Sequence, residues 1–226
     1  MGGMGEKEKE EMYEYVKKSE YAPVKNELEK IIKCVQIEMR EKYGLTFWFQ
    51  LIGSGKRHLV TRVRGGNSGY DFDYNLIIQR WGKMHYDAQI VKQSFMAALK
   101  NVLKGTKYSA PKDSTSAITI KVVDKKQNKI LHRCDFAIIY YEECSRNDGY
   151  YYLRNNKKQN VYAFVFRSIN FRIQEKANDI LGKDGGWAYI SEEYRKLKDI
   201  NEGNGKHSYS LYAEAVNNVY NQMFYQ

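Results

Sequence analysis

The chain has 226 residues, of which 42 % are hydrophobic and 14 % aromatic, and this composition is that of a globular protein rather than a disordered one. No run of about 18 apolar residues occurs and residues 1–10 contain no apolar stretch, which argues against a membrane span and a secretory signal. The net charge of +10 lies almost wholly in residues 41–134, which carry 17 basic and 6 acidic side chains, so we expect one region of the fold to attract phosphate groups.

The N-terminal part of the chain predicts one helix and one strand. Residues 1–22 form a Lys- and Glu-rich segment that we expect to fray or to form an exposed helix. In residues 24–39 the apolar positions recur at helical spacing, and Gly44 is placed to end that helix. Apolar and polar residues then alternate over residues 45–51, which predicts a β-strand.

Two glycine clusters follow this strand. Gly53-Ser54-Gly55 breaks the strand, and residues 65–69 form a strong turn cluster. Between the two clusters we expect Lys56–Arg64 to form a short helix. Residues 70–78 then have the composition of a second strand.

The next part of the chain predicts a helix and two hairpins. Residues 87–102 begin with an aspartate suited to an N-cap and continue with apolar residues on one helical face. Residues 117–123 and 130–141 predict two strands joined as a hairpin around 125–128. Residues 150–166 predict a shorter hairpin.

The C-terminal region, residues 167–226, is predicted to be helical, and its last helix has apolar positions from Tyr212 to Met223 on one face. This order of elements predicts an α+β fold, in which a mixed β-sheet backed by helices over residues 23–166 precedes a small C-terminal helical region.

Two aspartates mark the strand at residues 70–78. Residues two apart in a strand share a face, so Asp71 and Asp73 point the same way while Phe72 and Tyr74 point into the core. Paired carboxylates repel each other unless a cation lies between them. Mg²⁺ takes carboxylate oxygens together with substrate phosphates, so the pair predicts a magnesium site.

Asp135 is the single acid in the apolar strand at residues 130–141. A lone buried carboxylate needs a partner, because an unpaired buried charge is costly. An ion pair with Arg133, which shares its strand face, would supply one. Together with Asp71 and Asp73 on a neighbouring strand, metal ligation is the better explanation.

Residues 45–140 resemble the DNA polymerase β-like nucleotidyltransferase superfamily. That family has a hydrophobic residue and Gly-Ser, then a strand with two alternate acids, then a third acid on a later strand. Ile52, Gly53-Ser54, Asp71-Phe72-Asp73 and Asp135 match these positions. The long helix before the first strand is similar to that of the cyclic-oligonucleotide synthase and Mab-21-like branch.

The resemblance implies an enzyme that transfers a nucleoside monophosphate from a nucleoside triphosphate to a hydroxyl acceptor. Gly53 and Ser54 would hold the β- and γ-phosphates at a helix N-terminus. Asp71 and Asp73 would bind two Mg²⁺ (or Mn²⁺) ions, and Asp135 would complete the second metal site. The resemblance also implies that Lys56 and Arg57 bind the triphosphate. Alternatively, these two residues are solvated side chains on a helix.

One departure from the family pattern concerns spacing. Ser54 and Asp71 lie 17 positions apart, with Arg62–Gly69 as an apparent insertion. This loop would cover the nucleotide or contact the acceptor; alternatively, the Gly-Ser match is accidental.

Other enzyme classes fit the sequence poorly. Gly53-Ser54-Gly55-Lys56 is not a P-loop, because Gln50 and Arg57 occupy positions where that motif needs Gly and Ser or Thr. No nucleophile elbow of the Gly-x-Ser-x-Gly type occurs, which argues against a Ser-His-acid hydrolase.

The second hypothesis is a non-catalytic RNA- or nucleic-acid-binding module on the same fold. Tyr150-Tyr151-Tyr152, with Arg154, Lys157 and Lys158, would supply base stacking and phosphate contacts, with a tyrosine-rich edge strand as the alternative. The acceptor itself is left open among RNA ends, another nucleotide, a small molecule and a protein hydroxyl. The three cysteines form no close pair, so we expect a cytoplasmic protein; the oligomeric state is unknown.

Overall fold

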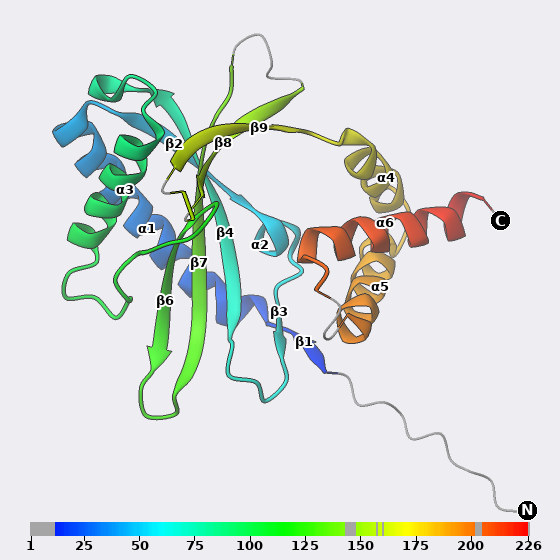
Figure 1. Ribbon diagram of the computed structural model, residues 1–226. Coiled ribbons are helices and arrows are strands. Elements are labelled where there is room, and N and C mark those ends of the chain that lie inside the picture. Colours follow the sequence, from blue (N-terminus) through cyan, green and yellow to red (C-terminus); the bar gives the residue numbers. More distant parts are fainter. Residues whose placement is uncertain (1–11, 143–147, 157, 160, 202–204, 226) are drawn as a thin grey trace, which may run out of the picture.

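The computed structural model describes residues 12–142, 148–156, 158–159, 161–201 and 205–225 (Figure 1). It is a mixed sheet with two helices on one face and three further helices beside one end of the sheet (Figure 1). None of the helices in these ranges is long and apolar enough to cross a membrane. The α+β layout with C-terminal helices is the predicted one.

The sheet has seven strands in the order β2-β4-β7-β6-β5, with β8 added to β7 and β9 added to β8. The bounds are β2 Thr46–Ile52, β4 Tyr70–Arg80, β5 Lys112–Asp113, β6 Ile118–Asp124, β7 Lys129–Tyr140, β8 Gly149–Asn156 and β9 Val161–Ser168. β4 and β7 run parallel, whereas the other neighbouring strands run antiparallel. The predicted strands and both predicted hairpins are therefore confirmed.

Two long helices cover the apolar face of the sheet. α1 (Lys18–Tyr43) ends as predicted at Gly44, whose φ of 68° lets its N–H bond the Arg40 carbonyl. α3 (Ala88–Val102) begins at Asp87, whose side chain accepts a hydrogen bond from the Ile90 N–H at 2.9 Å. A 3₁₀ turn, η1 (Gly82–Met84), precedes it. Both helices share one apolar core with the sheet residues that point towards them.

The predicted helix at Lys56–Arg64 is wrong. α2 spans Gly53–Arg57, and β3 (Thr61–Val63) follows and pairs antiparallel with β1 (Tyr13–Tyr15). β-Branched residues favour a strand at Thr61–Val63, and the partner strand that completes it lies about 48 positions earlier, beyond the reach of local periodicity. Arg62 secures the pair through ion pairs with Glu14 and Glu20.

The C-terminal helices are α4 (Phe171–Leu181), α5 (Gly186–Ile200) and α6 (Ser208–Phe224). They enclose a second apolar cluster formed by Leu59, Ala177, Ile180, Ile190, Tyr194, Leu211, Tyr212, Ala215, Val216 and Val219. In Figure 1 α2 lies between the sheet and α6. The division of the chain at residues 23 and 167 stays a prediction.

The ribbon of β1 and β3 connects the two parts of the molecule. The Tyr13 N–H donates to Asp199 Oδ1 at 2.8 Å, and the Tyr15 hydroxyl donates to the Ser191 carbonyl at 2.6 Å. Because both acceptors lie on α5, the N-terminal strand fixes this helix against the sheet. The insertion at residues 62–69 thus contributes a strand to the structure, and none of its residues lines the cavity described below.

Candidate active site

The three predicted acids lie on adjacent strands. Asp73 on β4 is directly opposite Asp135 on β7, and Asp71 is opposite Arg133. Phe72 and Tyr74 are fully buried on the other face of β4, so the acids project away from the core as predicted. Directly opposed residues in a sheet have neighbouring side chains, which brings the third carboxylate beside the first two.

Burial and the repulsion between neighbouring carboxylates raise the pKa values of Asp71 and Asp73. Burial, together with the charges of Asp135 and Asp71, raises the pKa of Asp73 to about 6 against the opposing charge of Arg57. Burial also raises the pKa of Asp71, while the cations Arg133 and Lys198 oppose the rise. Carboxylates kept together under these conditions gain from a bound cation.

Gly53 lies against one of the acids. It begins α2 with a φ of 63° and follows Ile52, the residue opposite Asp73 in the antiparallel pair. A Cβ on Gly53 would lie 2.5 Å from Asp73 Oδ2. Both the backbone angle and this contact favour glycine here. The match of this position to the resemblance therefore has a structural reason.

The other residues of α2 differ in their relation to the site. Ser54 lines the cavity beside Gly53, whereas Lys56 is exposed and does not line it. Arg57 lines it as well; its Nη1 donates to the Gly53 carbonyl at 3.0 Å, and its guanidinium lies 4.2 Å from the Tyr212 ring centroid. Arg57 therefore links the start of α2 to α6.

A cavity of about 910 Å³ opens in front of the acids. Asp71, Asp73 and Asp135 form its floor together with Gly53, Ser54 and Arg57. Its remaining walls come from α5 and α6, with Tyr194, Lys198, Ser208 and Tyr212, and from the β7–β9 region, with Tyr141, Tyr150, Arg167 and Asn170. The cavity thus lies where the sheet, the hairpin and the C-terminal helices meet.

Lys198 is the main site residue that sequence reasoning missed. Its Nζ donates to Ser208 Oγ at 2.9 Å, which joins α5 to the start of α6. Burial lowers the pKa of Lys198, and the nearby Asp71 opposes that change. In sequence Lys198 is one of two lysines on an amphipathic helix, and no local signal distinguishes the one that faces the acids.

Three carboxylates supply the hard oxygen donors that Mg²⁺ and Mn²⁺ prefer. The side chains of the described residues do not, however, converge into a preformed group of three or more metal ligands. Asp135 instead directs Oδ1 to Thr119, whose Oγ1 donates to it at 2.5 Å, rather than pairing with Arg133. The donor chemistry and strand register fit a divalent cation, and the carboxylates would have to turn towards it.

The tyrosine run has two different environments. Tyr150 lines the cavity. Tyr151 stacks on Tyr140 with an interplanar angle of 8°, and the Arg167 guanidinium lies 4.3 Å from the Tyr152 ring centroid. The Tyr150 ring in turn lies edge-on to that of Tyr141 with centroids 6.1 Å apart, so each of the three tyrosines contacts a neighbouring side chain. Lys157, predicted as part of the same surface, lies outside the described residues.

Comparison with protein-family models and with curated proteins finds no match. Solved structures do match. The Vibrio cholerae dinucleotide cyclase DncV in complex with GTP has a TM-score of 0.55 at 16 % identity over 90 % of this chain and 55 % of that chain.

Two further matches have bound nucleotides. DncV cyclic AMP-GMP synthase with the linear intermediate 5′ pppA(3′,5′)pG has a TM-score of 0.53 at 16 % identity, over 77 % of this chain and 45 % of that chain. The CD-NTase CdnG of Bradyrhizobium diazoefficiens with GTP has a TM-score of 0.50 at 14 % identity, over 75 % and 44 % respectively. This chain spans about half the length of the structures it matches. The chain therefore has the nucleotidyltransferase fold of the CD-NTases, as the sequence resemblance predicted.

Proposed function

We propose that the protein is a metal-dependent nucleotidyltransferase, which moves a nucleoside monophosphate from a nucleoside triphosphate to a hydroxyl acceptor. The observation that carries the proposal is the direct opposition of Asp73 and Asp135 on the floor of the cavity, with Gly53 in contact with Asp73. The shared fold of DncV and CdnG, whose structures contain nucleotides, supports it.

The residues around the acids would bind a triphosphate through two kinds of contact, hydrogen bonds and positive charge. The Gly53 and Ser54 amides and the Ser54 hydroxyl are the donors for the β- and γ-phosphates at the start of α2. Lys198 on α5 and Arg57 on α2 both line the cavity and add positive charge to it. Lys56 is exposed and does not line the cavity, so Lys198 takes the phosphate-binding role that was predicted for Lys56.

Asp71 and Asp73 would hold Mg²⁺ or Mn²⁺, and Asp135 would complete the site from β7. When bound, two such ions stabilise the entering and the leaving oxygen of an in-line displacement. The acceptor oxygen attacks the α-phosphorus, the bond from that phosphorus to the α–β bridging oxygen breaks, and pyrophosphate leaves. Asp135 lies beside the pair and takes up the proton that the acceptor hydroxyl loses.

An anionic acceptor, either an RNA end or a second nucleotide, fits this surface best. Arg133 is opposite Asp71, and Lys121 is opposite Arg133, so a basic row borders the acids on the open face of the sheet. Arg167 adds a further cation on the cavity wall. Such a field attracts phosphates and repels cationic small molecules. The free thiols of Cys34 and Cys134 suit the reducing cytoplasm that we propose as its location.

The test is an untargeted transfer assay. Each of the four nucleoside triphosphates, labelled at the α-phosphate, is incubated with Mg²⁺ or Mn²⁺, alone and with total RNA. We expect a labelled product that requires metal and is absent with Asp73→Asn. A product formed equally by this variant would contradict the proposed site.

A nucleic-acid-binding module without catalysis is the second candidate, because the carboxylates do not converge into a preformed ligand set among the described residues. Thermal unfolding separates the two candidates. Stabilisation by metal and triphosphate that disappears in the double variant Asp71→Asn/Asp73→Asn supports the enzyme. Stabilisation by RNA that is indifferent to metal, with no labelled product, supports the binding module.

A further inference from the structure

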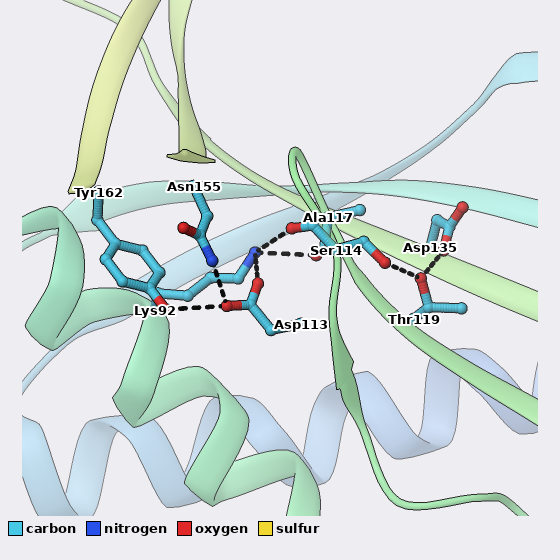
Figure 2. A network of polar contacts seen from close by, with 8 residues as sticks. All are labelled: Lys92, Asp113, Ser114, Ala117, Thr119, Asp135, Asn155 and Tyr162. Carbon is cyan, nitrogen blue, oxygen red and sulfur yellow. Dashed lines mark hydrogen bonds and ion pairs between the residues drawn. The ribbon is translucent and has the colours of Figure 1, made fainter. Parts of the chain in front are cut away.

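A buried ion pair lies behind the acidic site. Lys92 on α3 is 2 % exposed, and its Nζ lies 3.1 Å from Asp113 Oδ1 and donates to the Ala117 carbonyl at 2.9 Å (Figure 2). A buried ammonium group must keep such partners, because losing them leaves its charge uncompensated. Lys92 therefore fixes the segment around residues 113–117 relative to α3.

The same aspartate receives hydrogen bonds from the β8–β9 hairpin. Asp113 Oδ2 accepts from Asn155 Nδ2 at 2.7 Å and from the Tyr162 hydroxyl at 3.0 Å (Figure 2). The hairpin that carries Tyr150 and Arg167 to the cavity is thus connected to the same polar cluster.

From this cluster a chain of hydroxyl groups leads to Asp135. Ser114 Oγ lies 3.1 Å from Thr119 Oγ1, and Thr119 Oγ1 donates to Asp135 Oδ1 at 2.5 Å (Figure 2). A hydroxyl has one proton to donate. Because an ionised Asp135 only accepts, the Thr119 proton goes to it, and the Thr119 oxygen accepts from Ser114. The direction of the chain is therefore set from Ser114 through Thr119 to Asp135.

We propose that Thr119 is a positioning residue for Asp135, held in place by Ser114 and by the buried Lys92–Asp113 pair. The proposal rests on the proposed function, in which Asp135 is a metal ligand. Its bond to Thr119 occupies Oδ1, while Figure 2 shows Oδ2 pointing away from Thr119. Hydrogen bonds to ligating carboxylates select their orientation and tune the metal site.

The decisive comparison is Thr119→Val with Thr119→Ser. Valine keeps the shape of threonine but removes the donor, whereas serine keeps the donor. We expect Thr119→Val to weaken Mn²⁺ binding, measured by calorimetry without nucleotide, by about tenfold or more. The kcat should fall in parallel, while the affinity for triphosphate measured in chelator stays unchanged. Thr119→Ser should restore both properties to near the wild-type values. Wild-type Mn²⁺ affinity and kcat in a folded Thr119→Val protein would overturn the proposal.

Asp135→Asn separates this proposal from the proposed function. If Asp135→Asn leaves Mn²⁺ binding and transfer unchanged, the proposed function fails. If it abolishes them while Thr119→Val does not, only the positioning role fails. A crystal structure of metal-free Thr119→Val reports on positioning in either case: we expect Asp135 to leave its present rotamer, and an unmoved carboxylate would overturn the proposal.

The role of the buried pair has its own test. Replacing only one member would leave a buried charge and risk unfolding, so the variant is Lys92→Met/Asp113→Asn, which removes both charges. We expect a folded protein with a several-fold weaker Mn²⁺ affinity, in the same direction as Thr119→Val. A folded double variant with wild-type Mn²⁺ affinity would restrict positioning to Ser114 and Thr119 and overturn the anchoring role of the pair.

Discussion

Gly53 at the start of α2 and Asp73 on β4 are in contact, so closely that a Cβ on Gly53 would lie 2.5 Å from Asp73 Oδ2. Gly53→Ala should therefore displace the carboxylate as well as strain a backbone with a φ of 63°. A displacement of about 1 Å in a catalytic group lowers rates by roughly 100-fold. We expect a loss of that order in nucleotidyl transfer, measured as kcat/KM.

The matched control is Gly65→Ala. Gly65 has a φ of 66° and no atom within 4 Å of a built Cβ, so it has the same backbone strain without the contact. Both variants should lose about 1–2 kcal/mol of unfolding free energy through strain, and only Gly53→Ala should lose activity. Equal activities in the two variants would show that the contact with Asp73 does not matter.

Without metal, Asp73→Asn should stabilise the fold. Burial together with Asp135 and Asp71 raises the pKa of Asp73 to about 6, so the folded state bears a penalty for keeping it charged. The penalty is fully present above about pH 6 and disappears as pH falls towards the ordinary value of 3.8. At pH 8 in chelator we expect a gain on the order of 1–3 kcal/mol in the unfolding free energy.

Adding Mn²⁺ should make wild type more stable than Asp73→Asn, because the ion stabilises the wild-type site and not the variant. The measurement is a chemical denaturation series at pH 8 and pH 4, with chelator and with metal. The prediction is wrong if the variant is no more stable than wild type in chelator at pH 8, or if its advantage in chelator is as large at pH 4 as at pH 8.

Part of this site follows directly from the sequence. The alternation around Asp71 and Asp73 predicted their common face, and the apolar strand around Asp135 predicted a third acid on the sheet. The hairpin of β6 and β7 was also predictable, because its turn is local. The parallel pairing that sets Asp135 opposite Asp73 was not, since parallel neighbours are joined by long connections with no turn signal.

The other wall of the cavity was not predictable for a related reason. Periodicity predicts which face of α5 is apolar, but not which element that face packs against. Lys198 reaches the acids only because α5 is fixed against the sheet, partly through Tyr13 and Asp199. A different long-range contact, the pairing with β1, accounts for β3, where local reasoning predicted a helix.

Lys198→Met should weaken triphosphate binding more than it affects the fold. The ammonium group faces the cavity and bonds Ser208, so its loss removes a charged donor for a phosphate. Hydrogen bonds to charged groups contribute about 1.5–3 kcal/mol, so we expect the KM for the triphosphate to rise by roughly 10- to 100-fold. Lys196→Met is the control, because Lys196 lies on the same helix in an exposed ion pair with Glu192. A similar KM in both variants would remove Lys198 from the binding site.

His132 should make the protein lose stability in mild acid. It is 4 % exposed beneath the sheet, with Tyr108 Oη 3.3 Å from its Nε2, and burial together with the charge of Lys107 lowers its pKa to about 4. The folded protein keeps this imidazole neutral, whereas the unfolded chain binds a proton below about pH 6.5. His132 therefore does not lower the unfolding free energy above pH 6.5. As pH falls from 6.5 to about 4, this group alone lowers the unfolding free energy by about 3 kcal/mol.

Replacing the imidazole tests that sign. His132→Phe loses the hydrogen bond with Tyr108 and should be less stable than wild type at pH 7.5. It lacks the titrating group, so the difference between the two unfolding free energies should narrow, or reverse, on going to pH 4.5. His85→Asn, at an exposed position with positive φ that asparagine tolerates, should keep the wild-type pH dependence. Parallel stability curves for wild type and His132→Phe would mean that the buried imidazole gains its proton in the folded state as readily as in the unfolded chain.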